Sequence, residues 1–165
     1  PNHEKISTTA LVDETSSMME AKAAELDVEL KRAVSEDAGD FEADPQALRA
    51  MLLNLMENSL DACRVDTRKE HHWISIGVKG FEDEVAFTVE DNGIGMDRET
   101  KEKAFSLFFS SKGAKGTGHG LFIASKIVGA HGGRIEIESE MDKGTRLTVT
   151  LPREMRATAQ TNNNE

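Results

Sequence analysis

Residues 45–64 limit the possible folds of this chain more than any other segment, because they form a two-faced helix. Asp44 and Pro45 mark its start, since Asp is a favoured N-cap and Pro fits the first helical position. At about 100° per residue, the apolar side chains share one face and a polar stripe occupies the other. The stripe consists of Asn54, Glu57, Asn58 and Asp61. The segment therefore predicts a helix that covers an apolar layer.

Alternating apolar residues predict the layer under this helix. The alternation is typical of strands with one buried face. It covers residues 74–78, 85–89, 135–137 and 147–151, with shorter strands expected at 26–30 and 41–43. Further helices are expected at 8–26, 97–104 and 118–130, with a loop at 106–117. A mixed sheet covered on one face by about three helices is a two-layer α/β sandwich of the α+β class.

Composition narrows the class of protein. The 165 residues suit one domain, and a net charge of −10 argues against a nucleic-acid binder. No apolar run approaches the roughly 20 residues of a membrane span, and no secretory signal opens the chain. Cys63 is the single cysteine, so no intramolecular disulfide can form, and a reducing, cytoplasmic setting is the default. Residues 1–7 and the polar tail are expected to be frayed.

Asp91 and Thr145 are candidate ligand-binding residues on the inner face of the sheet. Asp91 is in period-two register with Val85, Phe87 and Val89, and a carboxylate there is costly unless a donor meets it. Thr145 is in register with the buried positions of the last strand. Together they could form hydrogen bonds with an amino group such as that of adenine. The alternatives are a plain Asp-Asn-Gly turn and an ordinary threonine at a strand start.

Two amides on the long helix are candidate metal ligands. Asn54 and Asn58 are four residues apart, so they share a helix face, where Asn is a mediocre helix former. The amide oxygen of Asn58 suits Mg²⁺, which takes oxygen ligands. Glu57 could serve as a base, although an ordinary surface glutamate explains it as well. A solvated helix face is the alternative for the whole stripe.

A glycine-rich segment, Gly116-Thr-Gly-His-Gly120, leads directly into a predicted helix. Glycines before a helix expose backbone N–H groups, and the helix N-terminus favours anions, so the segment resembles a phosphate cradle. It is neither a P-loop nor a dinucleotide fingerprint, because no core strand precedes it. Lys112 and Lys115 lie just upstream, as do three aromatic residues that could anchor a lid or belong to the core: Phe105, Phe108 and Phe109. A flexible linker is the alternative.

The histidines offer no metal site. His71 and His72 lack acidic or cysteine partners at ligand spacing, so zinc is not expected. His131 precedes two glycines and is interpreted as structural, and His3 lies in a loose terminus. His119 lies inside the glycine-rich segment, where it either touches a phosphate or faces solvent.

These motifs, taken in order, resemble the catalytic ATP-binding domain of bacterial two-component sensor histidine kinases, with the Bergerat fold shared with gyrase, Hsp90 and MutL. The resemblance covers residues 26–152. Asn54 to Ala62 is similar to the family's N box, and Asp91 to Met96 to its first glycine box. Phe105 to Lys112, Gly116 to Leu121, and Gly144-Thr145 resemble the phenylalanine box, second glycine box and last glycine box.

The resemblance implies a role for each matching position. Asn54, Asn58 and Lys112 would serve catalysis, with Asn58 binding Mg²⁺; Asp91 would accept from the adenine amino group, and Thr145 would support it through water. Gly93 and Gly95 would let a lid move. The implied ATP or ADP contacts are Asn58, Asp61, Asp91, Gly93, Gly95, Lys112, Gly116, Thr117, Gly118, His119, Gly120, Leu121 and Thr145.

The family's acceptor histidine in a dimerisation helix is absent, and His119 replaces a common leucine. The resemblance therefore implies a fragment that passes the γ-phosphoryl of ATP to a histidine on a separate dimerisation domain, with a response regulator downstream. Residues 1–23 would be a lead-in helix from that missing region, 24–153 the catalytic domain and 154–165 a disordered tail. The fragment would be monomeric, without nucleic-acid or membrane contact, in a parent that could be membrane-anchored.

Three rival functions stay open. A self-hydrolysing ATPase of the gyrase class needs a glutamate base one turn before the metal-binding asparagine, and Asn54 stands there. A stand-alone serine kinase of the anti-sigma-factor type fits the region from Phe105 to Gly120 less well. A non-catalytic nucleotide-sensing module is the third.

Overall fold

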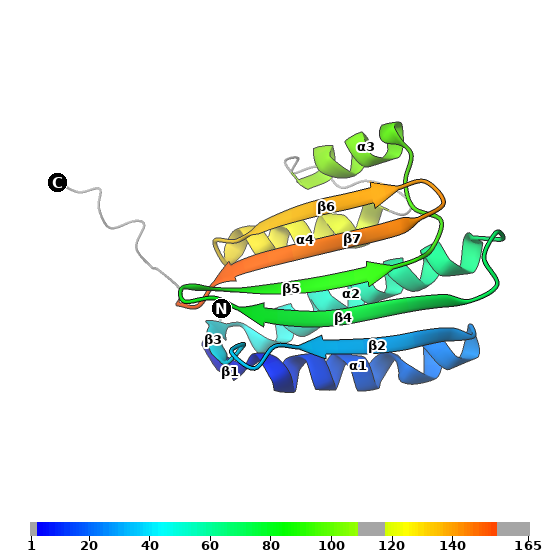
Figure 1. Ribbon diagram of the computed structural model, residues 1–165. Coiled ribbons are helices and arrows are strands. Elements are labelled where there is room, and N and C mark those ends of the chain that lie inside the picture. Colours follow the sequence, from blue (N-terminus) through cyan, green and yellow to red (C-terminus); the bar gives the residue numbers. More distant parts are fainter. Residues whose placement is uncertain (1–2, 109–117, 155–165) are drawn as a thin grey trace.

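The computed structural model describes residues 3–108 and 118–154 (Figure 1). Its first half contains β1 (Glu4–Ser7), α1 (Thr8–Glu25), β2 (Val28–Val34), β3 (Asp40–Ala43), α2 (Pro45–Val65) and β4 (His72–Gly80). Its second half contains β5 (Glu84–Asp91), α3 (Arg98–Phe108), α4 (Gly118–Ala130), β6 (Arg134–Glu140) and β7 (Gly144–Pro152).

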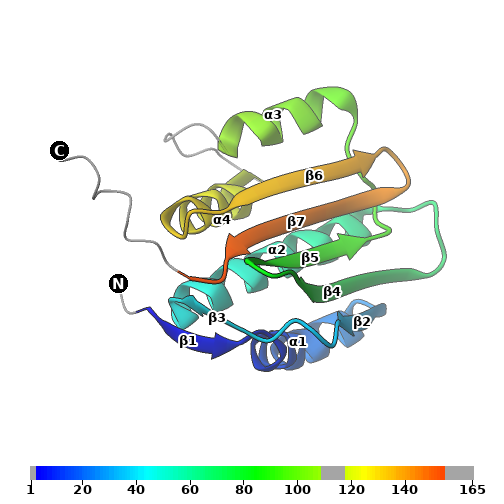
Figure 2. The same ribbon diagram turned by 60° about the vertical axis from the view of Figure 1, so that its left-hand side comes forward.

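The main sheet has five strands in the order β2-β4-β5-β7-β6. β2 pairs with β4 in parallel, and the other neighbours are antiparallel, so the sheet is mixed. α1, α2 and α4 line one face, and α3 packs against α4 and the edge strand β6 (Figures 1 and 2). The predicted two-layer α/β sandwich is confirmed.

Helix α2 lies at the centre of the helical layer. Asp44 caps it, because its Oδ1 accepts hydrogen bonds from the backbone N–H groups of Gln46 and Ala47 at 3.1 and 3.3 Å. Its apolar face packs on β4 and β5 and contacts α1 and α4. The buried residues of this face are Leu48, Met51, Leu52, Leu55, Met56, Ser59, Leu60 and Cys63. This helix matches the prediction from the sequence.

The prediction of a frayed N-terminus is wrong for residues 4–7. β1 pairs antiparallel with β3, with Ile6 opposite Phe41, and Ile6 packs against the core. The ring of His3 meets the ring of His131 edge-on, with centroids 5.2 Å apart. Ser7 then caps α1 by accepting a hydrogen bond from the N–H of Ala10. A segment too polar to predict a strand is ordered here by a partner more than 30 residues away.

Helix α1 is part of the helical layer. It packs on β2 and β4 and lies beside α2, burying Leu11, Val12 and Met19. It ends one residue before Leu26, and Asp27 turns the chain with φ of +60°. The strand after it runs from 28 to 34 instead of 26 to 30, because its register with β4 continues to Val78. The origin of α1 in a longer protein stays a prediction.

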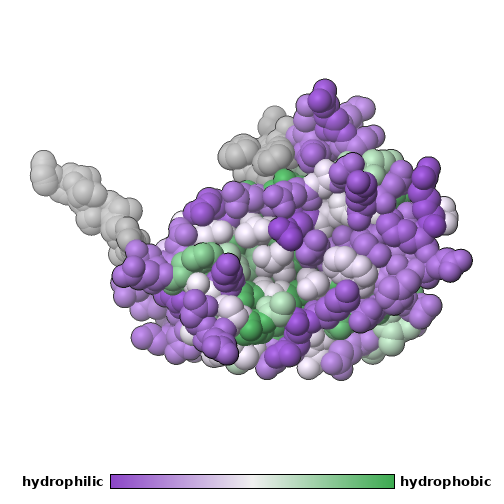
Figure 3. All heavy atoms as spheres, viewed as in Figure 1, coloured by the Kyte–Doolittle hydropathy of each residue, from purple (hydrophilic) through white to green (hydrophobic). Residues whose placement is uncertain are grey.

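The opposite face of the sheet is open (Figure 3). Charged residues surround a paler centre on this face. On this face Gly77 pairs with Thr88 across β4 and β5, and Thr88 pairs with Thr148 of β7. The alternation puts these residues on the face opposite Asp91 and Thr145, so the predicted site belongs to the helical side.

Candidate functional site

Asp91, Thr145 and the first turn of α4 lie at one end of the sheet. β5 ends there with Asp91, and β7 starts there with Thr145 directly opposite in register. On the far side of Thr145 the register partner is Ser139 of β6. α2 ends and α4 begins at this same end (Figure 1). Three strands and two helices thus bring together positions up to about 90 residues apart in sequence.

Asp91 is a buried carboxylate with donors arranged around it. Its residue is 4% exposed, and its Oδ1 accepts a hydrogen bond from the N–H of Gly93 at 2.8 Å. Burial raises the pKa of Asp91 to about 6, while the Gly93 N–H and the Ser59 hydroxyl act in the opposite direction. A carboxylate kept in this environment is available as a hydrogen-bond acceptor for a ligand group.

Thr145 is buried beside Asp91 and is held by Ser139. Their hydroxyl oxygens are 2.7 Å apart, and Ser139 also donates to the carbonyl of Gly144 and accepts from the N–H of Met96. Ser139 thereby ties the β6–β7 turn to the segment that follows Asp91. Sequence reasoning missed Ser139, although its register with Ile135 and Ile137 placed it on the inner face.

Gly93 and Gly95 permit close backbone approach. A Cβ at Gly93 would lie 2.6 Å from the carbonyl oxygen of Ala62 in α2. Gly95 has φ of +71°, and a Cβ there would lie 2.0 Å from the carbonyl oxygen of Glu140. Between them, Ile94 donates to the carbonyl of Ala62 and accepts from the N–H of Asp142. The glycines therefore hold this loop against α2 and the β6–β7 turn, and their role in lid motion stays a prediction.

The two amides of α2 are half-buried and available. Neither side chain of Asn54 or Asn58 forms a hydrogen bond within residues 3–108 and 118–154. Glu57 is exposed and its Oε2 lies 3.7 Å from the ammonium of Lys22. Asp61 is also exposed and pairs with Arg64 one turn later. The amides are thus the polar groups of this stripe without a protein partner in the described part of the chain.

The glycine-rich segment is described only from residue 118. Gly118, His119 and Gly120 form the first turn of α4, and Leu121 is buried. α4 packs along α2, so its N-terminus lies at the site end of the sheet. Such a terminus directs unpaired N–H groups and positive potential outward. The other predicted contacts, Lys112, Gly116 and Thr117, lie outside the described residues, as do Phe109 and Lys115.

Two histidines have acidic partners that the sequence analysis did not expect. His71 lies 3.0 Å from a carboxylate oxygen of Glu29, and His72 lies 2.7 Å from one of Asp66. The pairing of β2 with β4 and the end of α2 supply these partners, and each histidine meets a single carboxylate, which does not make a zinc-ligand set. Within the described residues, no group of three or more His, Cys, Asp or Glu side chains could hold a metal ion.

His131 has the structural role expected of it. It is buried, its Nδ1 lies 2.8 Å from the carbonyl of Ile127, and its Nε2 accepts from the N–H of Asp44. It thus joins the end of α4 to the start of α2. Asn92 is structural as well, since its amide bridges the carbonyl of His71 and the N–H of Trp73.

The donor set fits an adenine nucleotide. A buried acceptor and a supported hydroxyl suit an amino group, and the N-terminus of a helix suits phosphate. Amide oxygens on α2 suit Mg²⁺ shared with phosphate oxygens. A family model described as histidine kinase-, DNA gyrase B- and HSP90-like ATPase matches residues 43–155.

The chain belongs to this ATPase family. Among curated relatives, the methanogenesis regulatory histidine kinase FilI of Methanothrix harundinacea is 37% identical over 124 residues, which is 74% of this chain and 14% of FilI. The signal transduction histidine-protein kinase AtoS of Escherichia coli is 31% identical over 156 residues, which is 92% of this chain and 25% of AtoS. The chain thus spans a quarter or less of these two relatives.

Solved structures agree with this membership. The nucleotide-free catalytic domain of histidine kinase ThkA superposes with a TM-score of 0.77 at 28% identity, covering 93% of this chain and 99% of that domain. Full-length ShkA in complex with AMPPNP has the same fold, with a TM-score of 0.77 at 23% identity, covering 95% of this chain and 32% of ShkA. The resemblance to histidine-kinase catalytic domains is confirmed, and this chain is an ATP-binding domain of their type.

Proposed function

We propose that this domain binds Mg-ATP and transfers its γ-phosphoryl group to a histidine on a separate dimerisation domain of a sensor histidine kinase. The observation that carries the proposal is the buried Asp91 carboxylate, facing Thr145 across β5 and β7 at the end of the sheet where α4 begins. A buried acceptor at this place suits the adenine amino group. Family membership and the named relatives support the same reaction.

The nucleotide is held by residues of this chain in distinct roles. Asp91 accepts from the adenine amino group, while Thr145, fixed by Ser139, supports that contact through water. Bound Mg²⁺ would neutralise charge on the phosphate oxygens, with Asn58 as a protein ligand and Asn54 beside it. The turn from Gly118 to Gly120 donates N–H groups to phosphate. The remaining assigned contacts are Asp61, Gly93, Gly95, Lys112, Gly116, Thr117, His119 and Leu121.

Catalysis on this site consists of positioning and charge stabilisation. Asn54 carries an amide and cannot remove a proton, and Glu57 is engaged with Lys22 on the surface. The position one turn before Asn58 therefore holds no base for activating water, which favours transfer to a protein acceptor over ATP hydrolysis. Lys112 is assigned to the terminal phosphate, where a cation offsets developing charge.

The partners follow from the same reaction. The acceptor is a histidine-bearing dimerisation domain of the parent kinase, and a response regulator receives the phosphoryl group from it. ThkA, which has the same fold, has been solved in complex with the response regulator TrrA.

We infer that this domain works in the cytoplasm and is monomeric by itself. No helix in the described residues is long and apolar enough to cross a membrane.

Calorimetric titration with ATP and GTP, each with and without Mg²⁺, tests the nucleotide site. We expect saturable, Mg²⁺-sensitive binding of ATP, no binding of GTP, and weaker ATP binding in Asp91→Asn. Asp83→Asn in the β4–β5 hairpin is the matched control, because it removes an exposed carboxylate at the opposite end of the sheet. Binding of GTP equal to that of ATP would contradict the adenine assignment.

Phosphotransfer tests the reaction. The domain is mixed with radiolabelled ATP and a histidine-bearing dimerisation domain of the parent type, and the acid-labile label on the acceptor is counted. Label on the acceptor histidine supports the proposal. Label on serine would favour a serine kinase of the anti-sigma type, and tight ATP binding without any transfer would favour a nucleotide-sensing module.

A further inference from the structure

A buried charge cluster lies in the connection between α2 and β4, outside the motifs of the nucleotide site. Its centre is Asp66, whose side chain is 1% exposed. One oxygen, Oδ2, lies 2.7 Å from Nε2 of His72 and accepts from both the N–H and the ammonium of Lys69 at 3.2 Å. The other oxygen, Oδ1, is buried and accepts no hydrogen bond from the described residues.

The position of Asp66 is unfavourable for a helix-capping role. It follows the last residue of α2, where the negative end of the helix dipole repels a carboxylate. Its charge is held there by its neighbours, since the hydrogen bond with His72, and then those from Lys69, lower the pKa of Asp66 to about 2. The carboxylate therefore stays ionised at neutral pH and keeps the Lys69 ammonium in place.

Lys69 connects this cluster to the nucleotide site. Its ammonium, on a side chain that is only 25% exposed, also donates to the carbonyl oxygen of Gly93 at 3.2 Å. The N–H of the same Gly93 donates to Asp91. Gly93 is enclosed on its other side by the backbone of Ala62 and Cys63. Gly93 is thus fixed from one side by the end of α2 and from another by a lysine.

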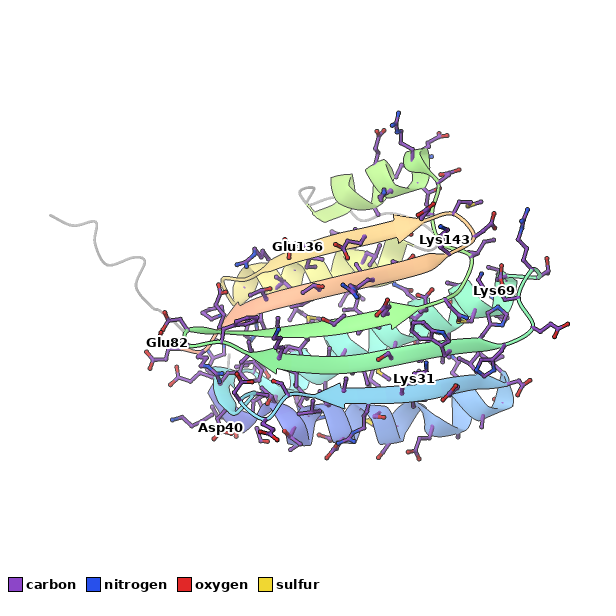
Figure 4. All side chains as sticks on the ribbon, in the orientation of Figure 1. Lys31, Asp40, Lys69, Glu82, Glu136 and Lys143 are labelled. Carbon is purple, nitrogen blue, oxygen red and sulfur yellow. The ribbon has the colours of Figure 1, made fainter. Side chains whose placement is uncertain are left out.

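We propose that Lys69, held by Asp66 and His72, is a positioning residue for nucleotide binding. By donating to the carbonyl of Gly93, it holds the Gly93–Ile94 peptide in place. This limits the rotation of the Gly93 backbone that would move its N–H away from the Asp91 carboxylate. This inference rests on the proposed function, since it names residues that support the same site. Figure 4 labels Lys69 in the α2–β4 connection, and Lys143 in the β6–β7 turn at the same end of the sheet.

The test compares three variants of this chain. Lys69→Met removes the ammonium and keeps much of the side chain. Lys69→Arg keeps a cation that can donate to Asp66 Oδ2 and to the carbonyl oxygen of Gly93. Lys143→Met is the matched control, because Lys143 is 72% exposed and pairs with Glu140 on the surface. We expect Lys69→Met to weaken ATP binding by about 3- to 30-fold, with Lys69→Arg close to wild type and Lys143→Met unchanged.

A second readout needs no nucleotide. The amide signal of Gly93 in a ¹⁵N-correlated NMR spectrum is expected to shift in Lys69→Met and to return toward its wild-type position in Lys69→Arg. Wild-type affinity in Lys69→Met together with an unmoved Gly93 signal would overturn the proposal. A wild-type chain that binds no nucleotide contradicts the proposed function instead, while the Gly93 signal still decides whether Lys69 positions this loop.

Asp66→Asn tests the same proposal if Lys69→Met fails to fold. It keeps a neutral acceptor for Lys69, so we expect the same direction of effect with a smaller loss. Because Asp66 acts through Lys69, the double variant should bind ATP no more weakly than Lys69→Met alone. If the fold-losses in ATP affinity of the two single variants multiply in the double variant, the two residues act independently. That result would contradict the proposal that Asp66 acts through Lys69.

Discussion

Asp91→Asn should make the nucleotide-free domain more stable while it weakens ATP binding. Burial raises the pKa of Asp91 from 3.8 to about 6, so the folded chain carries an unfavourable charge above pH 6. A tenfold change in proton affinity is worth about 1.4 kcal/mol, which puts the cost of that charge at about 3 kcal/mol. Asparagine cannot ionise, and its carbonyl oxygen can still accept from Gly93.

The pH dependence of the gain follows from the sign of the pKa change. The cost is present in full above pH 6 and disappears as the pH falls below 3.8, because Asp91 is then protonated in both the folded and the unfolded chain. Denaturant unfolding without nucleotide should show a gain of up to about 3 kcal/mol at pH 8 and about half of that at pH 5. The new amide nitrogen needs an acceptor, for which Ser59 is available, so about 3 kcal/mol is an upper limit.

The same substitution should cost affinity. Replacing the carboxylate removes the acceptor for adenine and weakens ATP binding by about 1–3 kcal/mol in calorimetry. Wild-type affinity should also fall roughly tenfold per pH unit below pH 6, because binding requires the ionised form. Asp83→Asn should show neither effect. The prediction is that Asp91→Asn raises the free energy of unfolding more at pH 8 than at pH 5. The same change in that free energy at both pH values, or a loss of stability at both, would refute the argument that the buried charge of Asp91 costs stability.

Three further substitutions test other parts of the structure. Asn58→Ala should abolish the Mg²⁺ dependence of ATP binding while thermal unfolding is unchanged; a retained Mg²⁺ effect would contradict the metal assignment. Gly95→Ala should destabilise the fold by at least about 2 kcal/mol in denaturant unfolding, because alanine disfavours φ of +71° and its Cβ would strike the carbonyl of Glu140. Arg153→Met should cost about 1–3 kcal/mol, since its guanidinium donates to four backbone carbonyls of the β2–β3 connection, β3 and the β4–β5 hairpin. Unchanged melting of either variant would contradict these packing arguments.

Local patterns were sufficient for most elements because their causes are local. The N-cap Asp44 and the two faces of α2 are properties of a few neighbouring residues, and the structure follows them closely. The inner-face register of Asp91 and Thr145 also follows from strand alternation alone. Even Ser139 was within reach, because the same alternation extends to it from Ile137.

Long-range contacts could not be found in this way. β1 is a strand only because β3 pairs with it, and its sequence Glu-Lys-Ile-Ser predicts no such thing. Arg153 reads as an ordinary residue near the end of the chain, yet it joins carbonyls more than 70 positions earlier. The acidic partners of His71 and His72 likewise depend on the neighbours that folding brings to them.

The sequence by itself therefore determined the class of fold, the ATPase motifs and the side of the sheet on which their residues lie, since these follow from periodicity and short spacing. Only the tertiary structure decided what supports those residues. Lys69 contacts Gly93 because the backbone at the end of α2 packs directly against the residues that follow β5. Such contacts depend on the register and packing of distant segments, which no local pattern encodes.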